Sequence, residues 1–180
     1  MYRRQIPWVT LAILILNVLG LAYEFIVGEN PAIYRFAMYQ GALEDGEWAR
    51  LIVSAFLHFG LAHFGSNMFC LAMFGLDLER RIGAWRYALI YAISIVGSGL
   101  LINFAGGRGI HAGASGAIWG LMTATLIFNM RSGRNPVYAL RGIMLNLVYS
   151  FSAGVSWQGH IGGGIAGLVA ALVLSDNRRL

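Results

Sequence analysis

The stretch Gly113-Ala-Ser-Gly-Ala-Ile-Trp-Gly120 decides how the rest of the chain is organised. It follows a glycine-rich run at 105–109 and opens an apolar segment, so we expect Ser115 at or beside the first residue of a helix. The first amides of a helix have no partner within the helix, and the helix dipole favours negative charge there. Ser115 is therefore either an ordinary helix cap or a nucleophile with an oxyanion site already beside it.

The composition around this stretch is that of a membrane protein. The chain has 180 residues, of which 58% are hydrophobic and 12% are charged, whereas soluble domains average about 25% charged residues. The formal net charge is +5, but the basic residues are all arginines in short clusters between apolar runs. Because no basic stripe is present, we expect a lipid bilayer around the chain and no nucleic-acid partner. Cys70 is the single cysteine, so the sequence predicts no internal disulfide, no metal site and no cofactor.

Apolar segments bounded by charge, glycine or proline recur along the whole chain. A bilayer-spanning helix needs about 17–25 residues, which makes the fourth and fifth segments short. The sequence therefore predicts an all-α polytopic membrane protein with a single domain over residues 1–180. The first segment is too long for a signal peptide and has no cleavage site after it. The six predicted spans are 8–27, 51–76, 86–104, 114–130, 137–153 and 158–175.

The arginines predict the orientation of these spans. An even number of spans puts both termini on one side, and positive residues favour the cytoplasm. With cytoplasmic termini, only Arg35, Arg50 and Arg108 face outward. Ten arginines then face inward: Arg3, Arg4, Arg80, Arg81, Arg86, Arg131, Arg134, Arg141, Arg178 and Arg179. The long connection at 28–50 would lie outside, and it is apolar enough that we expect it to pack on or into the outer leaflet.

Polar residues within the predicted spans are few, and such residues usually mark function. They include His58, His63 and Asn67 in the second span, Ser115 in the fourth and His160 in the sixth. Each of His63, Ser115 and His160 lies 16 residues before a charged residue near the inner end of its span. The charged residues are Glu79 for His63, Arg131 for Ser115 and Asp176 for His160. At 1.5 Å per residue, all three sit about 24 Å above the inner surface, recessed from the outer face. We expect one site at this depth.

Glycine spacing predicts which helices touch. Small residues at intervals of four allow two helix backbones to approach closely. If the fourth and sixth spans meet through these faces, His160 comes within reach of Ser115 and could act as its general base. The glycines concerned are Gly116 and Gly120 in the fourth span and Gly159, Gly163 and Gly167 in the sixth.

Further residues would complete this site. Asn67 lies one turn below His63, and neutral imidazole and carboxamide groups can both stabilise an oxyanion. Trp119 lies one turn below Ser115 and is either a core aromatic or a residue that packs on the imidazole. No Asp or Glu lies at this depth, so the residues predict a two-residue Ser–His device without a triad carboxylate.

With these residues in place, the chain resembles the rhomboid intramembrane serine proteases over nearly its whole length. The motifs that carry the resemblance are weak one by one, but their order along six predicted spans is specific to that family. They are GASG at 113–116, His63-Phe-Gly-Ser-Asn67, Gly159-His160-Ile-Gly-Gly163, the Glu79-Arg80-Arg81 run, and Trp48 with Arg50 in the first outer connection.

The resemblance implies a six-helix bundle whose cavity opens to the extracytoplasmic side. It implies Ser115 as nucleophile, His160 as general base, and His63, Asn67 and the Ser115 amide as the oxyanion site, supported by Gly113, Trp119 and Gly163. It also implies that the connection at 154–158 caps the site. Substrates would be single-pass membrane proteins cut near the outer end of their transmembrane helix. From the six-span form we expect the protein to lie in the plasma or inner membrane.

Two other functions remain open from the residues. One is haem or metal binding by His63 and His160 at equal depth, which gives no reason for Ser115. The other is a non-catalytic protein that binds client membrane helices in the same cleft. A small transporter would call for paired charges or broken helices in matching halves, which the sequence lacks. The sequence identifies neither the substrate nor the oligomeric state.

Overall fold

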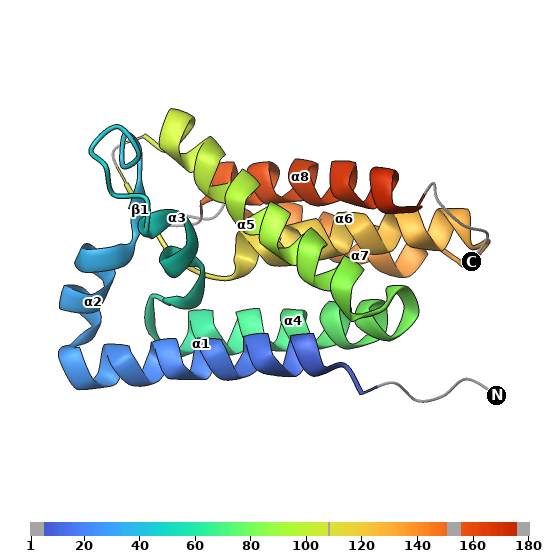
Figure 1. The fold of residues 1–180 in the computed structure, drawn as a ribbon, viewed down its shortest axis with the longest axis horizontal. Coiled ribbons are helices and arrows are strands. Elements are labelled where there is room, and N and C mark those ends of the chain that lie inside the picture. The colour runs from blue at the N-terminus through green and yellow to red at the C-terminus, as the bar shows by residue number, and fades with distance from the viewer. Residues whose placement is uncertain (1–5, 108, 151–155, 176–180) are drawn as a thin grey trace.

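The fold is an all-α bundle with one short β-ribbon (Figure 1). The structure is a computed structural model, and it describes residues 6–107, 109–150 and 156–175. Two strands, β1 (Met38–Tyr39) and β2 (Ile110–His111), pair antiparallel. The helices are α1 (Trp8–Val27), α2 (Glu29–Phe36), α3 (Arg50–Val53), the 3-10 turn η1 (Ser54–Phe56), α4 (Gly60–Ile82), α5 (Ala84–Ala105), α6 (Ser115–Arg131), α7 (Val137–Ser150) and α8 (Trp157–Ser175).

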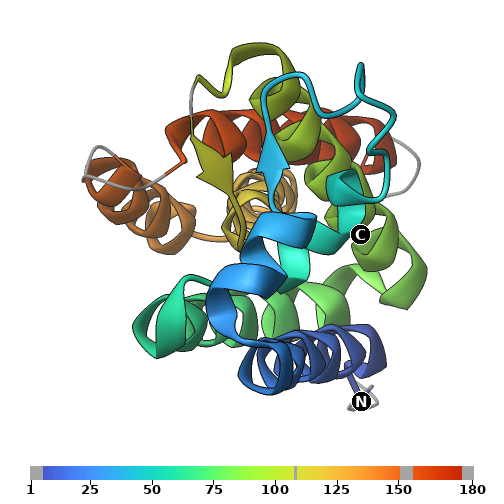
Figure 2. The same cartoon turned by 90° about the vertical axis from the view of Figure 1, so that its left-hand side faces the viewer.

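Helix α6 is the centre of the bundle. Figure 2 looks along the helices and shows α6 surrounded by α4, α5, α7 and α8, with α1 outside α4 and α5. Side chains on all sides of α6 are buried, among them Ile118, Leu121, Met122 and Phe128. Since α6 begins at Ser115, the packing of its neighbours positions that residue.

Four of the described helices, α1, α4, α5 and α8, are long and apolar enough to cross a membrane. Helix α6 has 17 residues and the described α7 has 14, and these two helices correspond to the fourth and fifth predicted segments, which the sequence marks as short. The predicted residues 151–153 of the fifth span lie outside the described part of the chain. The all-α prediction and a multi-pass arrangement are confirmed, while the count of six spans and the cytoplasmic termini stay predictions.

The expected start of the second span, at residue 51, is wrong. Residues 50–56 form α3 and η1, Leu57 is extended, and α4 begins only at Gly60, whose φ is +78°. The break leaves backbone groups to be satisfied inside the protein, and the buried Glu24 on α1 accepts the His58 amide at 2.6 Å. The apolar run continues through this break, so the sequence pattern does not show that the helix is interrupted. The acidic side chain on α1 replaces the helical acceptor that the backbone lacks at the break.

The connection at 28–50 packs against the end of α5. Its residues Ala37, Met38 and Ala42 have no exposed surface. Asn103 on α5 accepts the Leu43 amide at 2.9 Å through its side-chain oxygen. The β-ribbon joins this connection to the segment just before α6, so the loop braces the entrance to that helix. Its position relative to a bilayer leaflet stays a prediction.

Glu79 near the end of α4 holds the start of α1. Its carboxylate is 3% exposed and accepts the Val9 amide at 2.9 Å, the Thr10 amide at 2.7 Å and the Thr10 hydroxyl at 2.6 Å. A carboxylate at a helix N-terminus satisfies free amides and complements the helix dipole. The first residue of the Glu79-Arg80-Arg81 motif is thus a structural clamp between two helices.

Candidate active site

Gly113 shapes the turn into α6. Its φ is +124°, a conformation that side chains rarely adopt. A Cβ added there would lie 2.7 Å from Cε1 and 2.9 Å from Nε2 of His63. Glycine is therefore required on two counts, and its absence of a side chain lets the α6 N-terminus approach the His63 ring. Ser115 is the first residue of the helix, as the sequence predicted.

The glycine faces of α6 and α8 meet. A Cβ added at Gly116 would lie 3.0 Å from the Gly159 carbonyl oxygen, and one at Gly120 would lie 2.9 Å from the Gly163 carbonyl oxygen. The backbones are therefore nearly in contact along this face. The Thr123 hydroxyl also donates to the Gly164 carbonyl oxygen on α8 at 2.8 Å, which fixes the register of the two helices.

This contact brings Ser115 and His160 together. The Ser115 Oγ lies 2.8 Å from Nε2 of His160, whose side chain is almost completely buried. The Trp119 ring stacks on the imidazole with a centroid separation of 5.5 Å and an interplanar angle of 19°. The imidazole is thus held in plane by an aromatic surface while one nitrogen faces the serine hydroxyl.

The other nitrogen of His160 has a partner that the sequence analysis did not identify. Its Nδ1 lies 2.5 Å from the hydroxyl of Ser150, the last described residue of α7. Ser150 is 3% exposed, and its hydroxyl donates to the Asn146 carbonyl oxygen at 2.7 Å. A serine within an apolar run carries no sequence pattern that marks it as a partner of a histidine. The one available signal was its place near the outer end of the fifth predicted span.

His63 and Asn67 both belong to α4 and lie one helical turn apart. The Phe59 amide donates to His63 Nδ1 at 3.2 Å, so in the neutral ring the proton is on Nε2. The Asn67 amide nitrogen donates to the His63 carbonyl oxygen at 2.9 Å, which fixes which end of the carboxamide is the donor. Both side chains line a cavity of about 660 Å³ together with Ser115 and His160.

This cavity lies between α4 and α7. Its walls carry Asn67 and Cys70 from α4, and Leu145 and Asn146 from α7. Ser156 also lines it, while Gly154 and Val155 of the expected cap lie outside the described residues. The cavity is large enough for several residues of an extended peptide.

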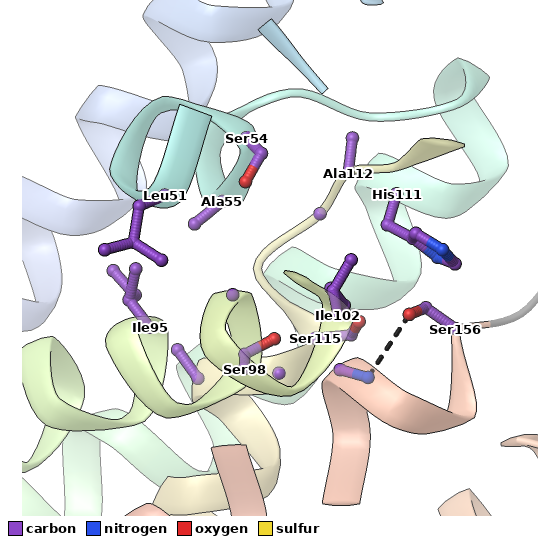
Figure 3. A pocket seen from close by; sticks show the side chains of 15 residues that line it. Leu51, Ser54, Ala55, Ile95, Ser98, Ile102, His111, Ala112, Ser115 and Ser156 are labelled. Carbon is purple, nitrogen blue, oxygen red and sulfur yellow. Dashed lines mark hydrogen bonds between the residues drawn. The ribbon is translucent and has the colours of Figure 1, made fainter. Parts of the chain in front are cut away.

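A second, much smaller cavity adjoins Ser115 on the α5 side (Figure 3). Its volume of about 20 Å³ suits a single water molecule. Hydroxyl groups of Ser54, Ser98 and Ser156 line it, and so does His111. The Gly159 amide donates to the Ser156 hydroxyl at 3.2 Å, the bond drawn in Figure 3.

His111 lies in β2, outside the long helices, and lines both cavities. Burial lowers the pKa of its imidazole, and a hydrogen bond to the Gly106 carbonyl oxygen at 3.1 Å offsets part of this effect. Sequence reasoning missed His111 because it falls in a loop between predicted spans, where depth along a helix cannot be counted.

Comparisons with known proteins agree with this architecture. The Rhomboid domain family matches residues 45–177. The chain is 34% identical over 144 residues to Rhomboid-type serine protease 2 of Emericella nidulans, and 37% identical over 140 residues to Rhomboid protease GluP of Bacillus subtilis. It is 35% identical over 147 residues to RHOMBOID-like protein 5 of Arabidopsis thaliana.

These alignments cover most of this chain but less than half of each relative. They include 73%, 73% and 77% of this chain, and 29%, 27% and 48% of the respective relatives. The shared part is the helical domain that holds the site, since the family match begins before α3 and runs through α8. The chain therefore belongs to the rhomboid family and is a multi-pass membrane protein.

Proposed function

We propose that this protein is a serine endopeptidase that cleaves single-pass membrane proteins near the outer end of their transmembrane helix. The observation that carries the proposal is the 2.8 Å contact between Ser115 Oγ and His160 Nε2 at the wall of a 660 Å³ cavity. A serine hydroxyl paired with an oriented base and facing a peptide-sized space is the arrangement that acyl transfer needs.

The chemistry begins when Ser115 attacks the carbonyl carbon of the scissile peptide bond. His160 accepts the hydroxyl proton at Nε2 as the Oγ–C bond forms, and it then returns that proton to the leaving amine as the C–N bond breaks. Negative charge develops on the carbonyl oxygen during attack. His63 Nε2–H, the Asn67 carboxamide and the Ser115 amide are the donors proposed to receive it.

The acyl-enzyme must then react with water. The 20 Å³ cavity beside Ser115 has the size and the hydroxyl lining to hold one water close to the ester. His160 would take a proton from that water, which attacks the acyl carbon, and would return the proton to Ser115 Oγ. We propose that Ser54, Ser98 and Ser156 keep this water within reach of the site.

The substrate reaches the site from the bilayer between α4 and α7, the helices that flank the cavity. A peptide bond in a regular helix has its carbonyl oxygen hydrogen-bonded and shielded, so the substrate helix must unwind locally before attack. We propose six spans with cytoplasmic termini in a plasma or inner membrane. In this orientation the cavity opens to the extracytoplasmic side, because Ser115 and His160 lie at the outer ends of their helices.

The test is cleavage of a panel of single-span substrates by purified protein in liposomes, together with labelling by a serine-reactive fluorophosphonate. Wild type should cleave and label, and Ser115→Ala should do neither while remaining folded. Ser66→Ala is the matched control, because Ser66 lines the same cavity and its hydroxyl bonds only the His63 carbonyl oxygen at 2.9 Å among the described residues. A fully active Ser115→Ala protein would end the proposal.

Two other results would favour a different function over the protease proposal. Folded wild type that neither cleaves nor labels, even in native membranes, favours a protein that binds client helices in this cavity. A Soret absorption band that disappears in His160→Ala favours haem binding. The geometry weighs against the second, because both ring nitrogens of His160 already lie within hydrogen-bond distance of serine hydroxyls.

A further inference from the structure

A chain of three hydrogen bonds runs from α6 through α8 to α7. Ser115 Oγ lies 2.8 Å from Nε2 of His160, and Nδ1 of the same ring lies 2.5 Å from Ser150 Oγ. Ser150 Oγ lies 2.7 Å from the Asn146 carbonyl oxygen. His160 and Ser150 are each 3% exposed, so water does not compete freely for the atoms in the middle of this chain.

The direction of each bond follows from the Asn146 end. A carbonyl oxygen can only accept, so the single hydroxyl proton of Ser150 points to Asn146. The Ser150 oxygen then faces His160 with its lone pairs, and the proton between them belongs to Nδ1. A neutral imidazole carries one proton, so Nε2 is left unprotonated and accepts the hydroxyl proton of Ser115.

We propose that Ser150, oriented by the Asn146 carbonyl group, is a positioning residue that holds His160 in the tautomer with a free Nε2. This inference rests on the proposed protease function, in which Nε2 is the base. Ser150 lines neither of the two cavities, and its hydroxyl contacts His160 and the Asn146 carbonyl oxygen, so it acts through the imidazole. As Nε2 takes up the Ser115 proton, the Nδ1–H bond to Ser150 persists and its neutral oxygen faces the developing positive charge.

The alternative is that Ser150 merely satisfies its own hydroxyl within α7. Buried serines commonly bond the carbonyl four residues earlier, and Ser94 on α5 does so with Ile90 at 2.7 Å. Ser94 is therefore a matched control, because Ser94→Ala removes an equally buried hydroxyl that has no histidine partner among the described residues. Only Ser150→Ala removes an acceptor from the base.

The experiment measures the tautomer and the kinetics in the same proteins. The side-chain nitrogens of ¹⁵N-histidine-labelled protein in detergent distinguish Nδ1–H from Nε2–H rings, and His160→Ala identifies the His160 signals. Wild type, Ser94→Ala and Ser150→Thr should show the Nδ1–H form. Ser150→Ala should lose it, and its kcat should fall about 10-fold, the loss expected for one hydrogen bond of about 1.4 kcal/mol. KM should be unchanged, and Ser150→Thr should recover kcat to within about 3-fold.

The outcomes separate this inference from the proposed function. Wild type that cleaves, with a Ser150→Ala protein unchanged in tautomer and kcat, overturns the role of Ser150 and leaves the protease proposal standing. Folded wild type that neither cleaves a substrate nor labels with the fluorophosphonate overturns the protease proposal. In that case a tautomer that changes in Ser150→Ala still supports the hydrogen-bond assignment, and one that does not change overturns it.

Discussion

Adding one methyl group at Gly163, in the variant Gly163→Ala, should move Ser115 on α6 away from His160 on α8. A Cβ there would lie 3.1 Å from the Gly116 Cα and closer still to the Gly116 carbonyl oxygen. Non-bonded heavy atoms pack at about 3.5–4.0 Å, so α6 and α8 would have to separate by at least about 1 Å. Both obstructing atoms belong to backbone, which no side-chain rotation can relieve.

The separation acts on stability and activity by different amounts. Overpacking costs about 1–3 kcal/mol, while replacing a helical glycine by alanine returns about 0.5–1 kcal/mol. Gly163→Ala should therefore be destabilised by at most about 2.5 kcal/mol and remain folded. Activity should suffer more, because a 1 Å misplacement of Ser115 from His160 costs about 100-fold.

The neighbouring residue Gly164 provides the control. A Cβ at Gly164 would meet the Trp119 ring at 3.5 Å and the Thr123 methyl group at 3.7 Å, both ordinary contacts. Gly164→Ala carries the same change in helix propensity, so it should be as stable as wild type or up to about 1 kcal/mol more stable. Its activity should stay within about 3-fold of wild type.

The assay is the rate of fluorophosphonate labelling, with thermal unfolding in the same detergent. Labelling reports the reactivity of Ser115 without the need for a known substrate. Equal labelling rates in Gly163→Ala and Gly164→Ala would refute the argument, because backbone contact between α6 and α8 would then not determine the distance between nucleophile and base.

Three further changes test other parts of the structure. Asn67→Ala should slow turnover by about 10–1000-fold, the range for loss of one oxyanion donor. Ser66→Ala removes a hydrogen bond to the same His63 carbonyl oxygen and should leave turnover unchanged. Equal turnover rates in the two variants would remove Asn67 from the site. Glu79→Ala leaves the buried amide and hydroxyl of Thr10 without an acceptor and should lower the free energy of unfolding by about 2–5 kcal/mol in chemical denaturation, with labelling retained once folded. The pKa of His111 is lower in the folded protein than in the unfolded chain, so protonation of its imidazole favours unfolding. Wild type should therefore lose stability as the pH falls below about 6.5, and His111→Asn should lose less. Identical pH dependence of the two proteins would contradict this reasoning.

The glycines and the polar residues within the apolar runs were enough to predict that Ser115 and His160 lie side by side. Counting along helices of fixed rise put Ser115 and His160 at one depth, and small residues at intervals of four indicated the faces that meet. These rules work because a bilayer restricts spanning segments to helices and makes buried polar groups rare. The same periodicity put Trp119 one turn below Ser115 but left open whether it packs in the core or on the imidazole, and in the structure its ring stacks on His160.

What the sequence did not reveal depends on contacts between segments with no regular spacing. The start of α4 was misplaced because Glu24, on another helix, satisfies the backbone at His58. His111 reaches the site through a two-residue strand pairing with Met38, and a strand so short has no periodicity to detect. The contact between Ser150 and His160 was missed because it depends on where α7 lies relative to α8, which apolar patterning along α7 does not fix.

The missing carboxylate at this depth has a physical reason under the proposed mechanism. An ionised Asp beside His160 would have to be buried with it, and burying a charge in a weakly polar layer is expensive unless it is fully paired. A serine whose proton is bound to a backbone carbonyl presents a neutral acceptor at 2.5 Å from Nδ1 without that desolvation. It stabilises the imidazolium less than a carboxylate would, but it selects the same tautomer. Under this proposal, the protein keeps the orienting function of a triad carboxylate while leaving out its charge.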